Sequence, residues 1–218
     1  MKIVFATLLL ALQTRGQVPL NARTAAPFDI TGYWLATGAT ASDDIDDVPL
    51  NATGQKIAAA WNPAKDVATS QQCRAYGAGG VMRLPGRLHI AWETTDTLRI
   101  DAEAGTQTRR FFFSGAQPFP AQASWQGHSI ARWTSTQLTA TTTHLASGYL
   151  RKNGIPYSAS TVLNETFARF VDKNGREYLD LSITVDDPPY LRQLYTKSYR
   201  YMKQADAAGW NPTRCSAK

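Results

Sequence analysis

The sequence feature that most constrains the fold is a series of short segments in which apolar and polar residues alternate. Leu88, Ile90 and Trp92 share one face of such a segment, whereas Arg87 and His89 share the other. This period of two is that of a β-strand with one buried face. Turn residues separate the segments at close intervals, and no long helical segment lies between them. The pattern favours sequential antiparallel strands and disfavours a parallel sheet built from β-α-β units.

About nine strands and one short helix are predicted in this way. The helix spans residues 53–61, with Thr53 expected as its N-cap and Asn62-Pro63 as its end. The predicted fold is mainly β, an antiparallel up-and-down β-barrel of about eight or nine strands, and a β-sandwich is the alternative. The predicted strands span residues 29–37, 87–93, 97–103, 107–113, 129–134, 138–144, 161–171, 177–185 and 191–203.

Residues 1–26 are expected to be a signal peptide, with an unstructured start as the alternative. Lys2 is followed by an apolar run, residues 3–12, which is too short to span a bilayer but suits a secretory leader. Residues 27–218 would then form a single barrel domain that is periplasmic or extracellular, with no membrane span. Removing the leader lowers the formal net charge from +6 to +3, which gives no support for nucleic-acid binding.

Two cysteines, Cys73 and Cys215, are an even number in a chain expected to be exported. They predict one disulfide, and two buried free thiols are the alternative. The chain has no Cys-x-x-Cys motif, which excludes a redox dithiol or a cysteine zinc site. Because no closely spaced pair of metal ligands occurs, neither a metal nor a cofactor is expected.

The tripeptide Gly32-Tyr33-Trp34, in the first predicted strand, resembles the Gly-x-Trp start of lipocalin-like barrels. The resemblance implies a lipocalin-like barrel in which sequential strands close on themselves. A barrel of about eight strands has an interior that can hold one small ligand.

Short motifs along most of the chain carry a second resemblance. They are Gln72–Gly77, Met82 with Pro85, Thr108–Arg110, Trp125–Ser129, Trp133, Thr142–Leu145, Gly148–Gly154, Glu165 and Asp186–Pro188. Together they resemble an uncharacterised family of secreted bacterial proteins, over roughly residues 29–215, and the resemblance implies no particular activity. Many of these relatives have Glu-Gly-Asp where this chain has Thr134–Thr136, which argues against a catalytic role for that turn.

Two of the three histidines, His128 and His144, are expected to face each other. If the strands around a three-residue turn at 135–137 pair as a hairpin, position 128 lies opposite position 144 on the same face. Two neighbouring imidazoles can act as acid and base, can bind a metal together with His89 or Glu93, or can form a surface pair without a role. His128 and His144 are therefore the candidate catalytic pair.

Glu165 is the third catalytic candidate because it lies between Leu163 and Phe167 in an apolar setting. A carboxylate there is either paired or has a raised pKa, and a salt bridge to Arg109 or Arg110 is the common case. Arg109 and Arg110 point to opposite faces of their strand, so one of them faces the interior and needs an anionic partner.

A long loop directly after His144 is a candidate mouth or lid of a pocket, with a solvated hairpin as the alternative. It carries Tyr149, Arg151 and Tyr157. The candidates for substrate binding are Arg109, Arg110, Tyr149, Arg151, Tyr157 and His89.

The predicted function is the binding of one small hydrophobic, aromatic molecule by an exported barrel. Cofactor-free acid–base catalysis of the lyase, isomerase or dehydratase type is one form of this function. A non-catalytic carrier or sensor of the cell envelope is the alternative, and a structural envelope protein is the third. If the protein is an enzyme, we expect titratable groups that face each other in a cavity. If it is a carrier, we expect the histidines to lie outside the cavity, and if it is a structural protein, we expect a filled barrel.

Overall fold

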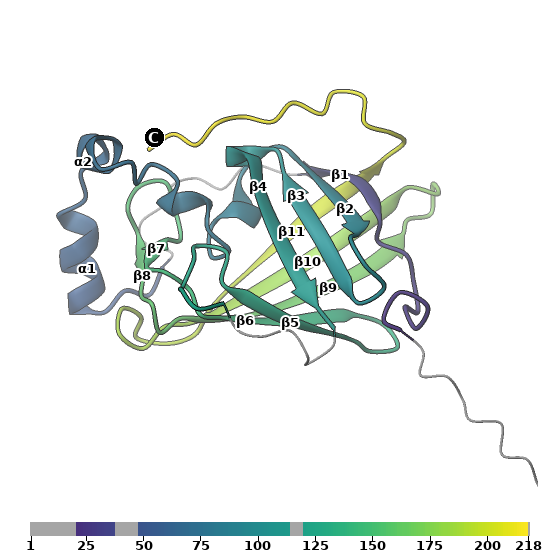
Figure 1. Cartoon of the computed structure of the whole chain (residues 1–218), viewed down its shortest axis with the longest axis horizontal. Helices are drawn as coiled ribbons and strands as arrows, with labels where there is room; N and C mark the ends of the chain where they lie inside the picture. Colours follow the sequence, from purple (N-terminus) through teal and green to yellow (C-terminus); the bar gives the residue numbers. More distant parts are fainter. Residues whose placement is uncertain (1–20, 38–47, 114–119, 218) are drawn as a thin grey trace, which may run out of the picture.

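The computed structural model describes residues 21–37, 48–113 and 120–217 of the chain. They form a β-barrel with short helices and a small hairpin at one end (Figure 1). The helices are α1 (Ala52–Ala59) and α2 (Pro63–Ala68), and short 3-10 turns span Arg74–Tyr76, Val81–Arg83 and Ala104–Thr106. The strands are β1 (Gly32–Thr37), β2 (Arg87–Trp92), β3 (Thr97–Ala102), β4 (Gln107–Phe112), β5 (His128–Trp133), β6 (Leu138–Thr143), β7 (Gly148–Tyr149), β8 (Pro156–Tyr157), β9 (Val162–Val171), β10 (Glu177–Asp186) and β11 (Tyr195–Gln204).

Nine of these strands close the barrel in the order β1-β11-β10-β9-β6-β5-β4-β3-β2, which confirms the predicted fold. Within the described residues, the one parallel pair is β4 with β5, where Phe111 pairs with Ser129 and Phe112 with Ile130. A closed ring with an odd number of strands cannot alternate in direction throughout, so at least one parallel pair is a geometric necessity. A parallel pair also needs a longer connection than a hairpin, and the segment between β4 and β5 supplies it.

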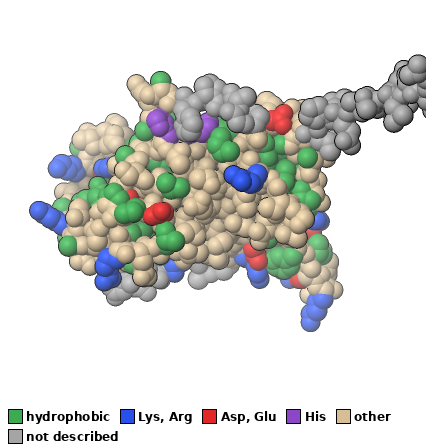
Figure 2. Space-filling view, turned by 90° about the horizontal axis from the view of Figure 1, so that it is seen from below, with side chains coloured by type: hydrophobic (Ala, Val, Ile, Leu, Met, Phe, Trp, Pro, Cys, Tyr) green, Lys and Arg blue, Asp and Glu red, His purple; other side chains and the backbone are tan. Residues whose placement is uncertain are grey.

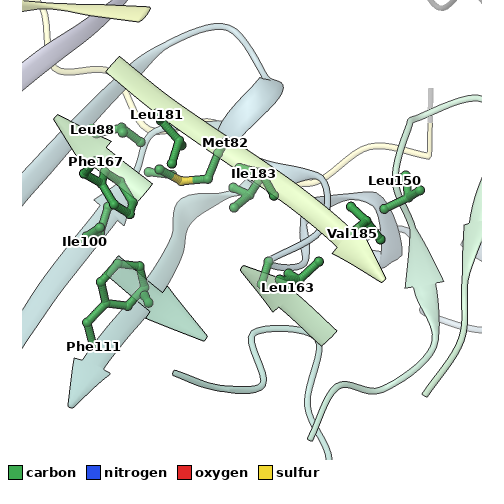
Figure 3. Close-up of a cluster of buried hydrophobic side chains, with 14 of the residues drawn as sticks. Met82, Leu88, Ile100, Phe111, Leu150, Leu163, Phe167, Leu181, Ile183 and Val185 are labelled. Atoms are coloured by element: carbon green, nitrogen blue, oxygen red, sulfur yellow. The ribbon is translucent and has the colours of Figure 1, made fainter. Parts of the chain in front are cut away.

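The inner faces of the strands form the hydrophobic core, as the alternation predicts. In β10 every second residue from Leu179 to Val185 is buried, whereas the residues between them are partly exposed. Figure 3 shows this core, in which the rings of Phe111 and Phe167 meet edge to face with their centroids 5.6 Å apart. Burying one such side chain is worth about 1.5–3 kcal/mol, so the inner face supplies most of the driving force for folding.

Described segments cover both ends of the barrel. At one end lie α1, α2, β7 and β8 (Figure 1), and Leu150 and Ile155 between the two short strands join the barrel core. At the other end, Nε1 of Trp133 donates to the carbonyl of Ala22 at 3.0 Å, and Phe28 packs edge-on against the same ring. These contacts indicate a barrel that is filled and covered at both ends, rather than one that is open to solvent at one end.

The described helices differ from the prediction at their caps. Asn51, not Thr53, caps α1, since its Oδ1 accepts the N–H of Gly54 at 3.0 Å. Asn62 and Pro63 were expected to end the helical region, but they begin α2 instead: Asn62 is its N-cap and Pro63 takes its first position. Proline is suited to that position because the N–H it lacks has no helical partner there.

The expected leader lies mostly outside the described residues. Its last six residues are described, and Ala22 among them is buried. Cys73 and Cys215 form the predicted disulfide, with Cα atoms 5.1 Å apart. It attaches the C-terminal segment, which runs back along the outside of the barrel (Figure 1). None of the helices in the described ranges is long and apolar enough to cross a bilayer.

Candidate functional site

Arg109 of β4 and Glu165 of β9 form an ion pair inside the barrel. The guanidinium donates to both carboxylate oxygens, at 2.7 Å to Oε1 and 2.5 Å to Oε2, and both side chains are at most 2% exposed. The hydroxyl of Thr142 accepts a further N–H of Arg109 at 3.2 Å and bonds to the hydroxyl of Ser129 at 2.7 Å. The salt-bridge alternative for Glu165 is therefore confirmed. Both carboxylate oxygens accept hydrogen bonds from the protein, which suits a role in stability.

Arg110, the next residue, points outward, as the alternation predicts. Its Nε and Nη2 donate to the carboxylate of Glu93 at 2.6 and 3.0 Å. These hydrogen bonds lower the pKa of Glu93 and raise the pKa of Arg110. Because the Arg110 side chain is 46% exposed, solvent screens the pair. Two adjacent residues thus hold the same kind of ion pair in two different environments.

The loop after β6 packs against the end of the barrel, which excludes the solvated-hairpin alternative. The hydroxyl of Tyr149 donates to Oδ1 of Asp66 at 3.2 Å and accepts from Arg74 at the same distance, and burial raises the pKa of Tyr149. Arg151 is buried and donates to the hydroxyl of Tyr195 at 3.2 Å. The loop is a packed cap in this structure.

Tyr157, the last candidate of this loop, is fully buried. A Cβ built on either Gly77 or Gly148 would lie 2.5 Å from its hydroxyl, so both positions need glycine. Burial strongly raises the pKa of Tyr157, which keeps the phenol neutral near pH 7. This side chain packs the cap to the barrel.

His128 pairs with Thr143 and not with His144, so the predicted register is wrong by one residue. The reason is the turn between β5 and β6, which holds four residues because Trp133 pairs with Leu138. His144 follows the strand with a φ of +58°, a left-handed conformation that few non-glycine residues adopt.

The two histidines are nevertheless neighbours on the outer side of the barrel. Strand alternation turns His128 outward, because the adjacent Ser129 points inward, and its ring stacks on Phe112 with the centroids 5.1 Å apart. Burial, followed by the charge on His144, lowers the pKa of His128. Figure 2 shows histidine side chains gathered at one place on the surface.

A pocket of about 240 Å³ lies on another part of the outer surface, over β1 to β4. One row of paired residues builds its floor: Tyr33 pairs with His89, His89 with Asp101, and Asp101 with Thr108. Residues that pair across antiparallel strands point to the same side, so these four side chains lie side by side. The described residues that line the pocket are Tyr33, His89, Arg99, Asp101, Ala102, Thr106, Gln107, Thr108, Trp210 and Pro212.

Three aromatic rings form one wall of this pocket. The rings of Tyr33 and His89 are stacked, with centroids 4.4 Å apart and planes 16° apart. The ring of Trp210, from the C-terminal segment, meets both rings edge-on at 5.6 and 6.3 Å. Stacked and edge-to-face pairs are favourable arrangements of aromatic rings, so the wall is preorganised.

The polar groups of the pocket centre on Asp101. Its Oδ1 accepts from Nε of Arg99 at 2.9 Å and from the hydroxyl of Thr108 at 2.5 Å. Its Oδ2 lies 3.8 Å from Nδ1 of His89, which is too long for a hydrogen bond. One oxygen of the carboxylate therefore remains able to accept an O–H or N–H donor beside the aromatic wall.

The C-terminal segment that carries Trp210 is fixed at several points. Arg87 donates to the carbonyl of Ala208 at 2.5 Å, and Oε1 of Glu103 accepts the N–H of Asn211 at 2.6 Å. The N–H of Thr213 donates to the carbonyl of Glu103 at 2.8 Å, and the disulfide follows at residue 215. Trp210 therefore belongs to an anchored strap.

The sequence-predicted residues do not assemble into one site. Arg109 and Glu165 lie inside the barrel, and the cap holds Tyr149, Arg151 and Tyr157. His128 and His144 are neighbours on the outer side of the barrel, where His128 is only 3% exposed. Of the predicted residues, His89 alone lines the pocket. The sequence did contain a signal for Asp101. If the predicted strands on either side of the turn at 94–96 pair as a hairpin, position 89 lies opposite position 101. No local signal could place Trp210, because its position depends on tertiary contacts of the strap.

No protein-family model matches the chain, and no curated protein or solved structure matches it. Within the described ranges, no group of three or more His, Cys, Asp or Glu side chains is placed to hold a metal ion. The functional interpretation therefore depends on the geometry of the pocket.

Proposed function

We propose that this protein binds one small aromatic molecule in the pocket between Trp210 and the row Tyr33–His89–Asp101. The observation that carries the proposal is an aromatic wall next to a carboxylate oxygen that can still accept a hydrogen bond. Pockets for small molecules characteristically combine apolar walls with a few convergent polar groups. The pocket lies outside the barrel, so a filled interior is compatible with binding.

The ligand class follows from the size and the polarity of the pocket. A volume of about 240 Å³ is below the roughly 300–1,000 Å³ typical of sites for drug-sized ligands, so a single ring fits best. Oδ2 of Asp101 can accept a hydrogen bond from a donor group of the ligand, and the guanidinium of Arg99 can donate a hydrogen bond to an oxygen of the ligand. These groups favour a hydroxylated single ring, such as a phenol, a catechol or a hydroxybenzoate.

The role that suits this arrangement is a carrier or sensor outside the cytoplasm. A disulfide that holds part of the pocket wall in place persists in oxidising compartments and is rare in the cytosol. Binding, unlike catalysis, also does not require a strained residue or a group with a strongly shifted pKa in the pocket.

Calorimetric titration with phenol, catechol and 4-hydroxybenzoate tests the proposal. We expect Trp210→Ala to weaken binding about tenfold, which is about 1.4 kcal/mol, because it removes one aromatic wall. Trp210→Phe should retain most of the affinity. Asp101→Asn should also weaken binding, whereas the matched control Asp180→Asn, in another outward Asp–Arg pair, should not.

Two results would contradict this function. One is that none of the three compounds binds at millimolar concentration. The other is that binding is unchanged in both Trp210→Ala and Asp101→Asn, which would move the ligand to another part of the molecule.

Acid–base catalysis by His128 and His144 is the second candidate function, and it ranks below the carrier because both histidines lie on the outer side of the barrel rather than in a cavity. It is favoured by the left-handed backbone of His144 beside an imidazole whose pKa is lowered, since strained residues cluster at active sites. Many lyases, isomerases and dehydratases begin by removing a proton from the carbon next to a carbonyl group, so proton–deuteron exchange at the methyl group of an aryl ketone such as acetophenone, followed by NMR in D₂O, tests it. His128→Ala should slow the exchange by about 10²–10⁴-fold. If the wild-type protein accelerates no exchange, this candidate is eliminated.

A further inference from the structure

A second hollow, of about 540 Å³, lies on the outer faces of β9, β10 and β11. It is a different arc of the barrel from the aromatic pocket, which lies over β1 to β4. We name it the β9–β11 groove. The described residues that line it are Thr37, Gln137, Thr166, Ala168, Asp180, Leu181, Ser182, Ser198, Tyr199 and Arg200.

Two rows of paired residues form the floor of the groove. In one row Ala168 pairs with Asp180 and Asp180 with Arg200; in the next, Thr166 pairs with Ser182 and Ser182 with Ser198. Most of these side chains are small, which makes the surface hollow, and three of them end in a hydroxyl. The floor therefore offers hydroxyl groups that can both donate and accept hydrogen bonds.

Among the described lining residues, the two charged side chains form an ion pair, so their charges cancel. Arg200 donates to both carboxylate oxygens of Asp180, at 2.6 and 2.8 Å, and no other described residue of the lining is charged. A groove without net charge does not attract an acidic or a basic polymer, so its chemistry suits a neutral ligand.

Two aromatic rings lie next to this ion pair on β9 and β10, two positions beyond the lining residues Ala168 and Asp180. The rings of Phe170 and Tyr178 are stacked with centroids 5.1 Å apart, and the guanidinium of Arg200 lies over them at 4.8 and 5.8 Å. Both aromatic residues are partly exposed. Sugars combine hydroxyl groups with C–H faces, and so they fit a surface of hydroxyls bordered by aromatic rings.

We propose that the β9–β11 groove binds a neutral polysaccharide chain. Thr37 and Gln137 mark its two ends, on β1 and on the turn before β6, so it crosses about four strand spacings, or roughly 19 Å. That length accommodates several sugar residues in a row. The open, elongated shape favours a chain over a single sugar. This site goes beyond the small-molecule pocket and does not depend on it.

Affinity electrophoresis in gels that contain hydroxyethyl cellulose, xyloglucan or dextran tests the proposal. We expect at least one of these neutral polymers to retard the protein. Ser182→Lys should reduce the affinity at least about tenfold, because a long charged side chain fills the groove. Thr184→Lys is the matched control, since it adds the same charge two residues further along the same outer face, outside the lining. Trp210→Ala should be retarded like the wild type, which separates this site from the aromatic pocket.

Ser198→Lys provides a second groove variant if Ser182→Lys fails to match the wild-type melting temperature. Three outcomes would overturn the proposal. They are no retardation by any of the three polymers, equal retardation of the groove variants and the Thr184→Lys control, and stronger retardation by anionic polygalacturonate. In the first of these cases, the wild-type protein could still show thermal hysteresis that the groove variants lose. That result would mean that the hydroxyl rows bind ice instead of a polysaccharide.

Discussion

The interior of the barrel and the aromatic pocket both hold an arginine next to a carboxylate, but the two carboxylates differ in burial and in how many of their oxygens the arginine binds. Inside, Arg109 donates to both oxygens of Glu165, and neither side chain is more than 2% exposed. Outside, Arg99 donates to one oxygen of Asp101, and these side chains are 43% and 18% exposed. A buried carboxylate needs a hydrogen-bond donor for each of its oxygens, whereas water tolerates a carboxylate with an open oxygen. A ligand can take the place of that water, so the incomplete pair is the one suited to binding.

The disulfide is where we expect the largest effect, because it affects both regions. The double variant Cys73→Ser/Cys215→Ser opens a loop with a sequence separation of 142 residues. In the chain-entropy model this costs about 4–5 kcal/mol of unfolding free energy. Urea unfolding measures the loss, and the strap that carries Trp210 should also release the aromatic ligand. Unchanged stability together with unchanged binding would mean that the strap is held without the disulfide.

Breaking the interior pair should have the next largest effect. Glu165→Gln leaves the Arg109 charge buried without its partner and should cost about 3–5 kcal/mol, measured by urea unfolding. The double variant Arg109→Met/Glu165→Met should recover most of this loss, because it removes both charges. A loss below about 1 kcal/mol in Glu165→Gln would show that the interior is more hydrated than the structure indicates.

Glu93→Ala is the control that the chain itself offers. It breaks the pair of Arg110, which neighbours Arg109 in sequence but is exposed. An exposed pair is worth about 0.2–1 kcal/mol, so the same measurement should show only a small loss. Similar losses in Glu93→Ala and Glu165→Gln would contradict the assigned orientations.

Asp101→Asn sharpens the comparison, since it should separate binding from stability. The pair with Arg99 is partly exposed, so unfolding free energy should fall by less than about 1 kcal/mol. Aromatic binding should weaken, because the amide accepts a ligand donor less well than the carboxylate. A destabilisation as large as that of Glu165→Gln would instead make Asp101 a structural residue.

The smallest effect that we expect is a pH dependence from His128. Its pKa is lowered in the folded protein, so the unfolded chain, with a pKa near 6.5, takes up the proton first. Stability from this group is therefore complete above about pH 6.5 and falls as the pH drops below that value. Unfolding curves between pH 7.5 and 5 should show this loss, and His128→Gln should reduce it. An equal loss in the variant would assign the effect to other groups.

The fold was predictable because local patterns determine it. The period of two located every barrel strand to within a few residues and placed Arg109 and Arg110 on opposite faces. The partner of His128 was missed because the turn has four residues instead of three, which shifts the register. The local sequence pattern does not reveal the length of this turn. The site was largely missed because its aromatic wall needs Trp210, and distant contacts with Arg87 and Glu103 position the strap.

The most direct test of the central claim uses the six tryptophans as reporters. We would titrate ¹⁵N-labelled protein with catechol and follow the indole N–H signals, with Trp210→Phe and Trp34→Phe identifying two of them. The largest shift should belong to Trp210, which borders the outer pocket. The contrary result is a largest shift at Trp34, whose indole is buried and donates to the carbonyl of Ile30 at 2.8 Å. That result would place the ligand inside the barrel.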